Sequence, residues 1–389
     1  MKEKFKRIFE QITFPNGAEV GSRFAMAPMV IVGSEAGGAV GEEDLKYWER
    51  RNDSAALLIT GATAVSEYSD AYGHGLGIYK DEQLESWKRL AEVMKAKGNL
   101  AVVQLFHAGY RSPFTYRDKG VVYGASTKKY DFLEYPVTGL TEDQIEEVLN
   151  DFAAAAKRVI EAGFDGIEIH GANRYLIQQF FSRISNERSD RWGGSLENRA
   201  RFGIETVKRI QSVIKEHAYP GFILGYRISP EEAHRHGDGY TFDEALYLID
   251  KVADLGVDYI STSQFGTRGF AATPKAGAYI DRPINAVVKE KLAGRALLMG
   301  AGDLTDPDKI LEAVTDYADI AAAATILFLD PDTQTKIREG REDEVTLNVT
   351  ERNIEALHIP KRFYTIAPLI LTSEFIPGET KTLIYKSEA

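Results

Sequence analysis

The sequence predicts a (β/α)8 barrel with a C-terminal extension, and three observations lead to this fold class. Short apolar stretches alternate with amphipathic helical patterns along most of the chain. Few polar residues interrupt these apolar stretches, as is typical of parallel strands that are buried on both faces. Consecutive strand–helix units with right-handed crossovers most economically close into a barrel.

The strands and helices of this barrel can be placed along the chain. We expect strands at Phe24–Met29, Ala56–Thr60, Ala101–Leu105, Gly166–Ile169, Phe222–Ile228, Tyr259–Ser263, Ala296–Met299 and Ile320–Ala324. The clearest helical patterns are Asp81–Lys97, Glu142–Ala162, Glu197–Glu216, Phe242–Leu255, Ile284–Leu292 and Pro307–Asp316. Helix ends are marked by N-capping residues and by C-capping glycines, at Thr141, Ser195, Thr241, Gly98, Gly163 and Gly256.

The competing fold is an open, doubly wound sheet, which usually carries a glycine-rich turn after its first strand. Here that position reads Ala27-Pro28-Met29, so the barrel is favoured. We assign residues 1–331 to the barrel. The charged and less regular residues 332–389 form a helix-plus-tail extension packed on it, with a hairpin-like or edge-packing end at Phe375–Tyr385.

Composition and charge exclude several classes of protein. The 389 residues carry a net charge of −11, whereas surfaces that bind nucleic acid or anionic membranes are basic. The chain has no cysteine, which excludes disulfides, thiolate nucleophiles and iron–sulfur clusters. No secretory signal or long apolar run is evident. We therefore expect a cytoplasmic protein that acts on a small-molecule substrate, without nucleic-acid or membrane partners; a homo-oligomer is compatible with the sequence.

Polar side chains cluster at the predicted carboxyl ends of the strands, where barrels of this kind bind ligands. His170, Asn173 and Tyr175 follow the fourth strand, Gln104 lies near the end of the third, and Arg227 near the end of the fifth. The amide and the guanidinium suit the edge of a planar heterocycle, although either could instead be a satisfied core residue. No inward pair of carboxylates or strand-end lysine is present, which argues against a glycosidase or a Schiff-base aldolase.

Two further features concern anions and metals. Gly302 follows the seventh strand, and barrel phosphate sites are built from the loops after strands seven and eight. His234 and His236 form an H-x-H pair on a polar loop, but no third ligand is evident. We expect a phosphate site and no metal site.

Segments that carry these residues resemble the old yellow enzyme family of FMN-dependent NAD(P)H oxidoreductases and ene-reductases. The two most specific segments are EIHGANRYLIQQFFS and NERSDRWGGSLENRARF, at 168–182 and 186–202. The others are SRFAMAPM (22–29), ATAV (62–65), VVQLFHAG (102–109), YRISP (226–230) and ADIAAAATILFLDP (318–331). The resemblance covers about Phe14 to Pro331 and indicates the single-domain form without an iron–sulfur cluster.

The resemblance implies a reaction and roles for the residues after the fourth strand. FMN would be bound, and NADH or NADPH would supply the hydride that passes from flavin N5 to an activated alkene, quinone or nitro compound. His170 and Asn173 would bind the carbonyl or nitro oxygen of the substrate. Tyr175 would protonate the α carbon after the hydride reaches the β carbon.

The resemblance also implies which residues contact the cofactor. Gln104 and Arg227 would bind the pyrimidine edge of the flavin, where a cation stabilises the reduced form. An apolar wall against the ring and a set of backbone N–H groups toward the phosphate complete the expected cofactor site, at Pro28, Met29, Ala62, Gly302 and Asp303.

The chain departs from the family pattern at several positions. Val30 stands where Thr or Cys usually contacts the flavin, and Arg111 is displaced by one position from its usual place. After the eighth strand, Ala324-Thr325 replaces the usual Gly-Arg, whose arginine holds the phosphate. Loss of that contact would cost about 1.5–3 kcal/mol, so FMN binding should be weakened rather than abolished. The alternative function is a barrel that has lost tight flavin binding and acts as a ligand-binding or regulatory protein.

Overall fold

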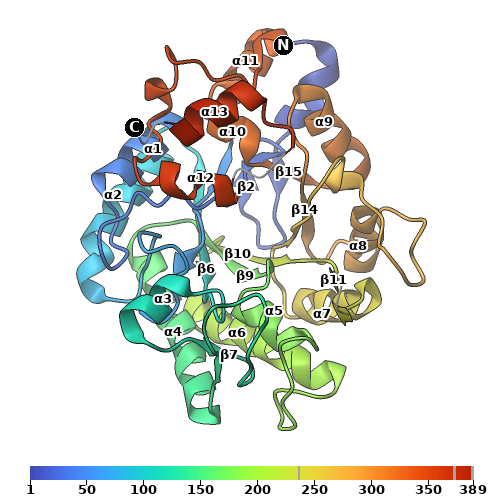
Figure 1. The fold of residues 1–389 in the computed structure, drawn as a ribbon. Coiled ribbons are helices and arrows are strands. Elements are labelled where there is room, and N and C mark those ends of the chain that lie inside the picture. The colour runs from blue at the N-terminus through green and yellow to red at the C-terminus, as the bar shows by residue number, and fades with distance from the viewer. Residues whose placement is uncertain (235–236, 371–373, 387–389) are drawn as a thin grey trace.

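A closed barrel of parallel strands forms the centre of the molecule (Figure 1). The computed structural model describes residues 1–234, 237–370 and 374–386. The barrel strands are β3 (Phe24–Met26), β4 (Leu57–Ile59), β6 (Leu100–Phe106), β9 (Gly166–Gly171), β10 (Ile223–Ile228), β13 (Tyr259–Thr262), β14 (Leu297–Ala301) and β15 (Ile320–Ala323). Each pairs with the next in parallel, and the pairing of β15 with β3 closes the ring. The predicted barrel is therefore confirmed.

The strand register brings the predicted polar residues to one end of the barrel. Arg227 on β10 lies directly opposite His170 on β9, and Gln104 on β6 lies opposite Glu168 on β9. All barrel strands run in the same direction, so their carboxyl ends meet at one edge. The loops at that edge carry the side chains considered below.

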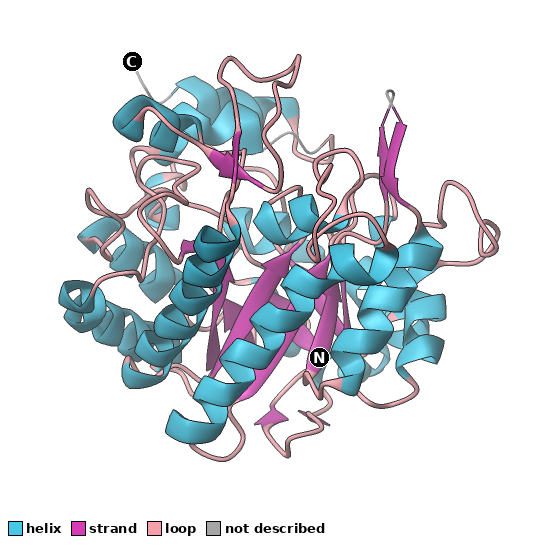
Figure 2. Ribbon diagram, turned by 90° about the horizontal axis from the view of Figure 1, so that it is seen from below, coloured by secondary structure: helices cyan, strands magenta, loops and turns pink. Residues whose placement is uncertain are grey.

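Helices surround the barrel, and their starts follow the expected capping chemistry (Figure 2). The hydroxyls of Thr141, Ser195 and Thr241 each accept a backbone N–H of the first helical turn. The helices are α1 (Glu42–Arg51), α2 (Leu84–Lys95), α3 (Pro113–Lys119), α4 (Glu142–Glu161), α5 (Leu176–Phe181), α6 (Leu196–His217), α7 (Phe242–Asp254), α8 (Ile284–Leu292), α9 (Pro307–Glu312), α10 (Thr325–Leu329), α11 (Thr333–Glu339), α12 (Phe363–Ile370) and α13 (Gly378–Lys386). None of the helices in the described ranges has the length and apolar composition needed to cross a bilayer.

Besides the barrel strands given above, there are short strands that were not predicted, because they have too few residues for a periodic pattern. They are β1 (Ile12–Thr13), β2 (Glu19–Val20), β5 (Thr63–Ala64), β7 (Tyr123–Gly124), β8 (Thr138–Gly139), β11 (Glu232–His234) and β12 (Gly237–Tyr240). One of these short strands, Thr63–Ala64, pairs with β6 in the barrel sheet. Of the H-x-H sequence, His234 ends β11, whereas Arg235 and His236 lie outside the described residues.

The amino-terminal end of the barrel is closed by the β1–β2 hairpin. Ile12, Phe14 and Val20 pack in one cluster with the barrel-strand residues Val102 and Met299. In Figure 2 this hairpin lies at the end of the barrel opposite the C-terminal helices. The carboxyl end of the barrel is therefore the end available for ligands.

The C-terminal segment differs from its predicted conformation. The expected hairpin-like end at Phe375–Tyr385 is wrong, because Gly378–Lys386 forms helix α13. Thr380 and Ile384, one helical turn apart, are both buried, so this short segment uses a helical rather than an alternating apolar face. The division into residues 1–331 and 332–389 stays a prediction.

Candidate active site

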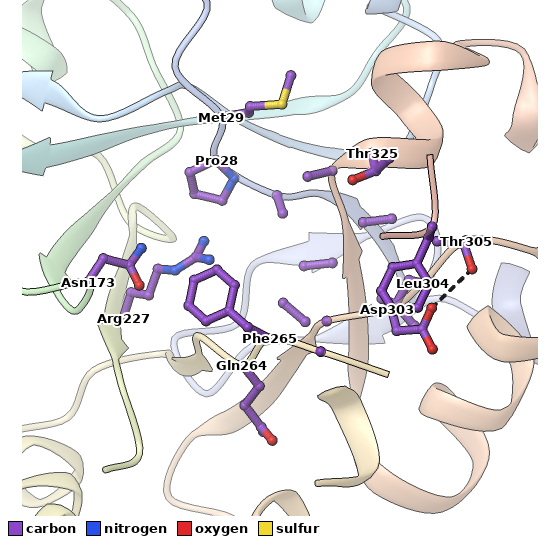
Figure 3. Close-up of a pocket in the computed structure, with 18 of the residues that line it drawn as sticks. Pro28, Met29, Asn173, Arg227, Gln264, Phe265, Asp303, Leu304, Thr305 and Thr325 are labelled. Carbon is purple, nitrogen blue, oxygen red and sulfur yellow. Dashed lines mark hydrogen bonds between the residues drawn. The ribbon is translucent and has the colours of Figure 1, made fainter. Parts of the chain in front are cut away.

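A cavity of 450 Å³ lies at the carboxyl ends of the barrel strands (Figure 3). Most of the residues predicted for the site line it: Pro28, Met29, Asn173, Arg227, Gly302, Asp303, Ala324 and Thr325. In Figure 3, Asn173 and Arg227 lie at one side of the cavity, whereas Asp303 and Thr325 lie at the opposite side. The site therefore has two ends, which differ in chemistry.

Four predicted residues lie beside the cavity instead of lining it: His170, Tyr175, Ala62 and Gln104. Ala62 packs in a small apolar cluster with Tyr175 and Phe106. Gln104 is buried, and its Nε2 donates to Oε1 of Glu168 at 2.6 Å. Glu168 was not singled out from the sequence, although a carboxylate inside an apolar strand is a signal for a buried polar network.

The His170 ring is held as a neutral hydrogen-bond donor. The backbone N–H of Ala172 donates to Nδ1 at 3.2 Å, so the proton of the neutral ring belongs on Nε2. Burial, together with the nearby cations Arg227 and Arg111, holds the pKa of His170 well below its usual range. The ring therefore stays neutral at physiological pH and can offer Nε2–H to an acceptor.

Asn173 is oriented by the neighbouring strand. Ser263, which follows β13, donates its hydroxyl to the Asn173 Oδ1 at 2.9 Å. With the side-chain oxygen engaged, the carboxamide nitrogen remains as a donor. Asn173 also has a φ of 57°, a left-handed conformation that asparagine tolerates better than most residues. Backbone and hydroxyl thus fix this amide as a second donor.

Tyr175 contributes a protonated phenol. The ring is buried and makes edge-to-face contacts with His170 and Phe106, each with a centroid separation of 4.9 Å. Its hydroxyl shares a hydrogen bond with that of Tyr72, a partner that the sequence did not indicate. Burial, and to a lesser extent Tyr72, raises the pKa of Tyr175 well above its usual value. The group therefore keeps its proton at any physiological pH.

Arg227 is the cation among the described residues that line the cavity. Its Nη2 donates to the Ser263 hydroxyl at 3.2 Å, so one serine joins Arg227 to Asn173. Burial lowers the pKa of Arg227, and the charge of Glu168 opposes that shift. Ser263 was not among the predicted site residues, although its position at the end of the predicted strand Tyr259–Ser263 is a signal for it.

The cavity has features that fit the ring and chain of FMN. The Arg227 Nε and the Gln264 Oε1 are buried without hydrogen-bond partners among the described residues, which leaves both available to a heterocycle or its hydroxylated chain. Gly302 has a φ of 109°, and a Cβ there would lie 2.8 Å from the Gln264 carbonyl oxygen. Only glycine fits this turn, so the backbone is open to close approach by a ligand. Pro28 and Met29 provide an apolar wall.

The opposite end of the cavity fits a phosphate less well. Asp303 and Glu374 bring carboxylates to the lining, and Thr325 supplies a hydroxyl where the family has arginine. The Asp303 carboxylate is engaged, since it accepts from Lys309 Nζ at 2.8 Å and from the Arg268 N–H at 2.7 Å. Phosphate contacts at this end would come from backbone N–H groups and the Thr325 hydroxyl.

The comparisons with known proteins agree with this geometry. Residues 7–344 match the model of the NADH:flavin oxidoreductase / NADH oxidase family. An uncharacterized oxidoreductase of Streptococcus pyogenes serotype M5 is 39% identical, covering 98% of this chain and 97% of its own. A probable NADH-dependent flavin oxidoreductase of Bacillus subtilis is 32% identical, and the match covers 97% of this chain and 99% of that protein. The solved structure of the old yellow enzyme homologue from Zymomonas mobilis superposes with a TM-score of 0.75 at 23% identity. The match covers 92% of this chain and 98% of that protein.

The fold and the comparisons define a barrel oxidoreductase that works with a flavin. The chain belongs to the NADH:flavin oxidoreductase / NADH oxidase family, which includes the old yellow enzymes. It is an NAD(P)H-dependent enzyme with FMN as its cofactor.

Proposed function

We propose that this enzyme reduces an activated alkene, a quinone or a nitro compound, with Tyr175 as the proton donor. FMN, when bound, supplies hydride from its N5 position. The proposal rests on one observation: two fixed donors, His170 Nε2–H and the Asn173 amide, lie beside a protonated phenol. These are the groups that reduction of a polarised double bond requires.

The two donors would act on the substrate oxygen. Charge develops on a carbonyl or nitro oxygen as hydride reaches the β carbon, and donors that are already oriented stabilise that charge without reorganising. The neutral state of His170 suits this role, because the ring donates a hydrogen bond and keeps its proton. The proton needed at the α carbon would then come from Tyr175.

The remaining polar residues would hold the cofactor. Arg227 and Gln264 offer buried, unpartnered atoms to the flavin, and Pro28 and Met29 pack against the ring. Gln104 would contribute indirectly, by orienting Glu168, whose Oε1 accepts a hydrogen bond from the Gln104 amide.

The test is a pair of anaerobic half-reactions on the FMN-loaded protein. NADH and NADPH are each mixed with the enzyme while flavin absorbance is followed, and 2-cyclohexen-1-one, menadione and a nitroaromatic are then added in turn. We expect the reduced flavin to be reoxidised by at least one acceptor. Flavin that NADH reduces but none of the three reoxidises would contradict the proposal. A protein that stays colourless in excess FMN would favour the ligand-binding alternative.

The donor pair can be tested separately with Asn173→Asp. This change keeps the size of the side chain but replaces a donor with an acceptor, so reoxidation by cyclohexenone should slow by about 10²- to 10³-fold. The control is Asn150→Asp, which makes the same chemical change at an exposed residue of α4 that does not line the cavity. This control should leave the rate of reoxidation unaltered.

A further inference from the structure

A second cavity adjoins the first at the side where the substrate oxygen would lie. It measures 300 Å³ and shares Asn173 and Phe265 with the first cavity. Three cations line it, namely Arg111, Arg174 and Lys275. The roles proposed above use none of these three residues.

Arg111 lies directly beside the proposed catalytic groups. Its Nη1 donates to the backbone carbonyl of Asn173 at 2.7 Å, and its guanidinium carbon lies 5.2 Å from the centroid of the Tyr175 ring. It makes no salt bridge with a carboxylate in the described parts of the chain. A charged side chain is therefore fixed next to Tyr175, with donors to spare.

Arg174 occupies a backbone position that is unfavourable for arginine. It has a φ of 62° and follows Asn173, whose φ is 57°, so two consecutive residues other than glycine are left-handed. Strain of this kind is concentrated at functional sites, where the side chain is needed in that place. The Arg174 side chain is exposed, and its guanidinium has no hydrogen-bond or ion-pair partner among the described residues.

The two carboxylates that line the second cavity are already engaged. Glu231 accepts the backbone N–H of Lys275 at 3.0 Å, and Glu232 accepts from the Gln178 amide at 2.9 Å. Three cations face two carboxylates, so the lining keeps a net positive charge. A cavity with free guanidinium donors is suited to a carboxylate, which arginine binds through paired hydrogen bonds.

We propose that the second cavity binds a carboxylate of the acceptor, so that the acceptor is an activated alkene that also carries an acidic group. This inference rests on the proposed function. The activating oxygen would lie at His170 and Asn173, and the carboxylate would extend past Asn173 to Arg111 and Arg174. NAD(P)H would provide one hydride, which carries both electrons and would be delivered to the β carbon by the bound FMN, and Tyr175 would supply the one proton to the α carbon. The C=C bond becomes a single bond, and the carboxylate is unchanged.

The test compares an acid with its neutral ester. (E)-4-oxopent-2-enoate and its methyl ester share the same ketone and alkene, and they differ in charge at one end. For each enzyme we take the ratio of kcat/KM for the acid to kcat/KM for the ester. This ratio removes the intrinsic difference in reactivity when variants are compared with the wild type.

The informative variant is Arg174→Gly. Glycine adopts the left-handed backbone freely, so the variant should unfold at the same temperature as the wild type or higher. The acid-to-ester ratio should fall about 10-fold or more, because a charge-assisted contact is lost. Arg174→Lys keeps the charge and should keep most of the ratio. Arg117→Ala removes an exposed cation from α3 outside both cavities, and it should change nothing.

Binding provides a readout that does not depend on turnover. Titrating the acid into the oxidised holoenzyme should perturb flavin absorbance, with a Kd raised about 10-fold or more in Arg174→Gly. An unchanged ratio together with an unchanged Kd would overturn the inference. A rise in KM for NADH instead would also overturn it, because the cavity would then serve the phosphates of the dinucleotide. A wild type that binds the acid but reduces neither compound would instead contradict the proposed function.

Discussion

The two ends of the main cavity are built in different ways. At one end, Asn173 and Arg227 are buried or half-buried, and Ser263 joins them by hydrogen bonds. At the other end, Thr325 and the backbone around Gly302 face the cavity, and the nearby Asp303 carboxylate is neutralised by Lys309. Figure 3 shows these groups on opposite sides.

The two ends of the cavity differ in how well they tolerate amino-acid substitutions. Ser263 binds both Asn173 and Arg227, so a substitution at one of these residues disturbs the others. The end with Thr325 and Gly302, where the FMN phosphate is expected, relies on backbone N–H groups that any sequence supplies. Loss of a single side chain there should therefore reduce the free energy of FMN binding only moderately. The chain keeps the first end of the family pattern and departs from it at the second.

The largest effect is expected at Tyr175. Tyr175→Phe removes the proposed proton donor while keeping the ring contacts with His170 and Phe106. Flavin reoxidation by cyclohexenone should slow by about 10²- to 10⁴-fold, the usual contribution of a general acid. Stopped-flow absorbance measures this rate, and flavin reduction by NADH serves as the internal control. Equal losses in both half-reactions would refute the proposed role.

The phosphate end should respond to Thr325→Arg. Restoring a cation there should tighten FMN binding about 10- to 100-fold, measured by quenching of flavin fluorescence. Thr325→Val tests the opposite direction, because it removes the hydroxyl and keeps the shape; it should weaken binding by up to about 10-fold. If neither change alters the Kd, the phosphate is held elsewhere.

The smallest effect is expected at Ser263. Ser263→Ala frees both Asn173 and Arg227 while keeping the strand intact, so acceptor reduction should slow by about 2- to 10-fold. FMN affinity should fall by a similar factor if Arg227 binds the flavin. A loss in acceptor reduction alone would assign Ser263 to the substrate end only.

The sequence was sufficient to predict the barrel, and most of the residues predicted for the site line one cavity. Continuous apolar strands and capped helices have local causes, so their positions could be read directly from the chain. Polar residues at strand ends also follow a local rule, which placed Asn173 and Arg227 on the cavity. The exact ends of strands were less predictable: the first was expected to reach Met29 but ends at Met26, because Pro28 lacks an N–H for the ladder.

Contacts between distant segments could not be predicted in this way. Tyr72 reaches Tyr175 from a loop that has no regular pattern, and Phe375 comes to the cavity lining from the C-terminal extension. Gln104 donates its amide to Glu168 on the neighbouring strand, a partner that the sequence did not indicate. Each of these depends on how the chain returns to the barrel, which local sequence does not specify.

The β1–β2 hairpin has a kinetic consequence. Because Ile12, Phe14 and Val20 fill the amino-terminal end of the barrel, every reactant enters and leaves by the same opening. The hydride donor and the acceptor must then occupy that opening in turn. Reciprocal plots against NADH at low acceptor concentrations should give parallel lines. Excess acceptor should compete with NADH for the oxidised enzyme and raise the slopes.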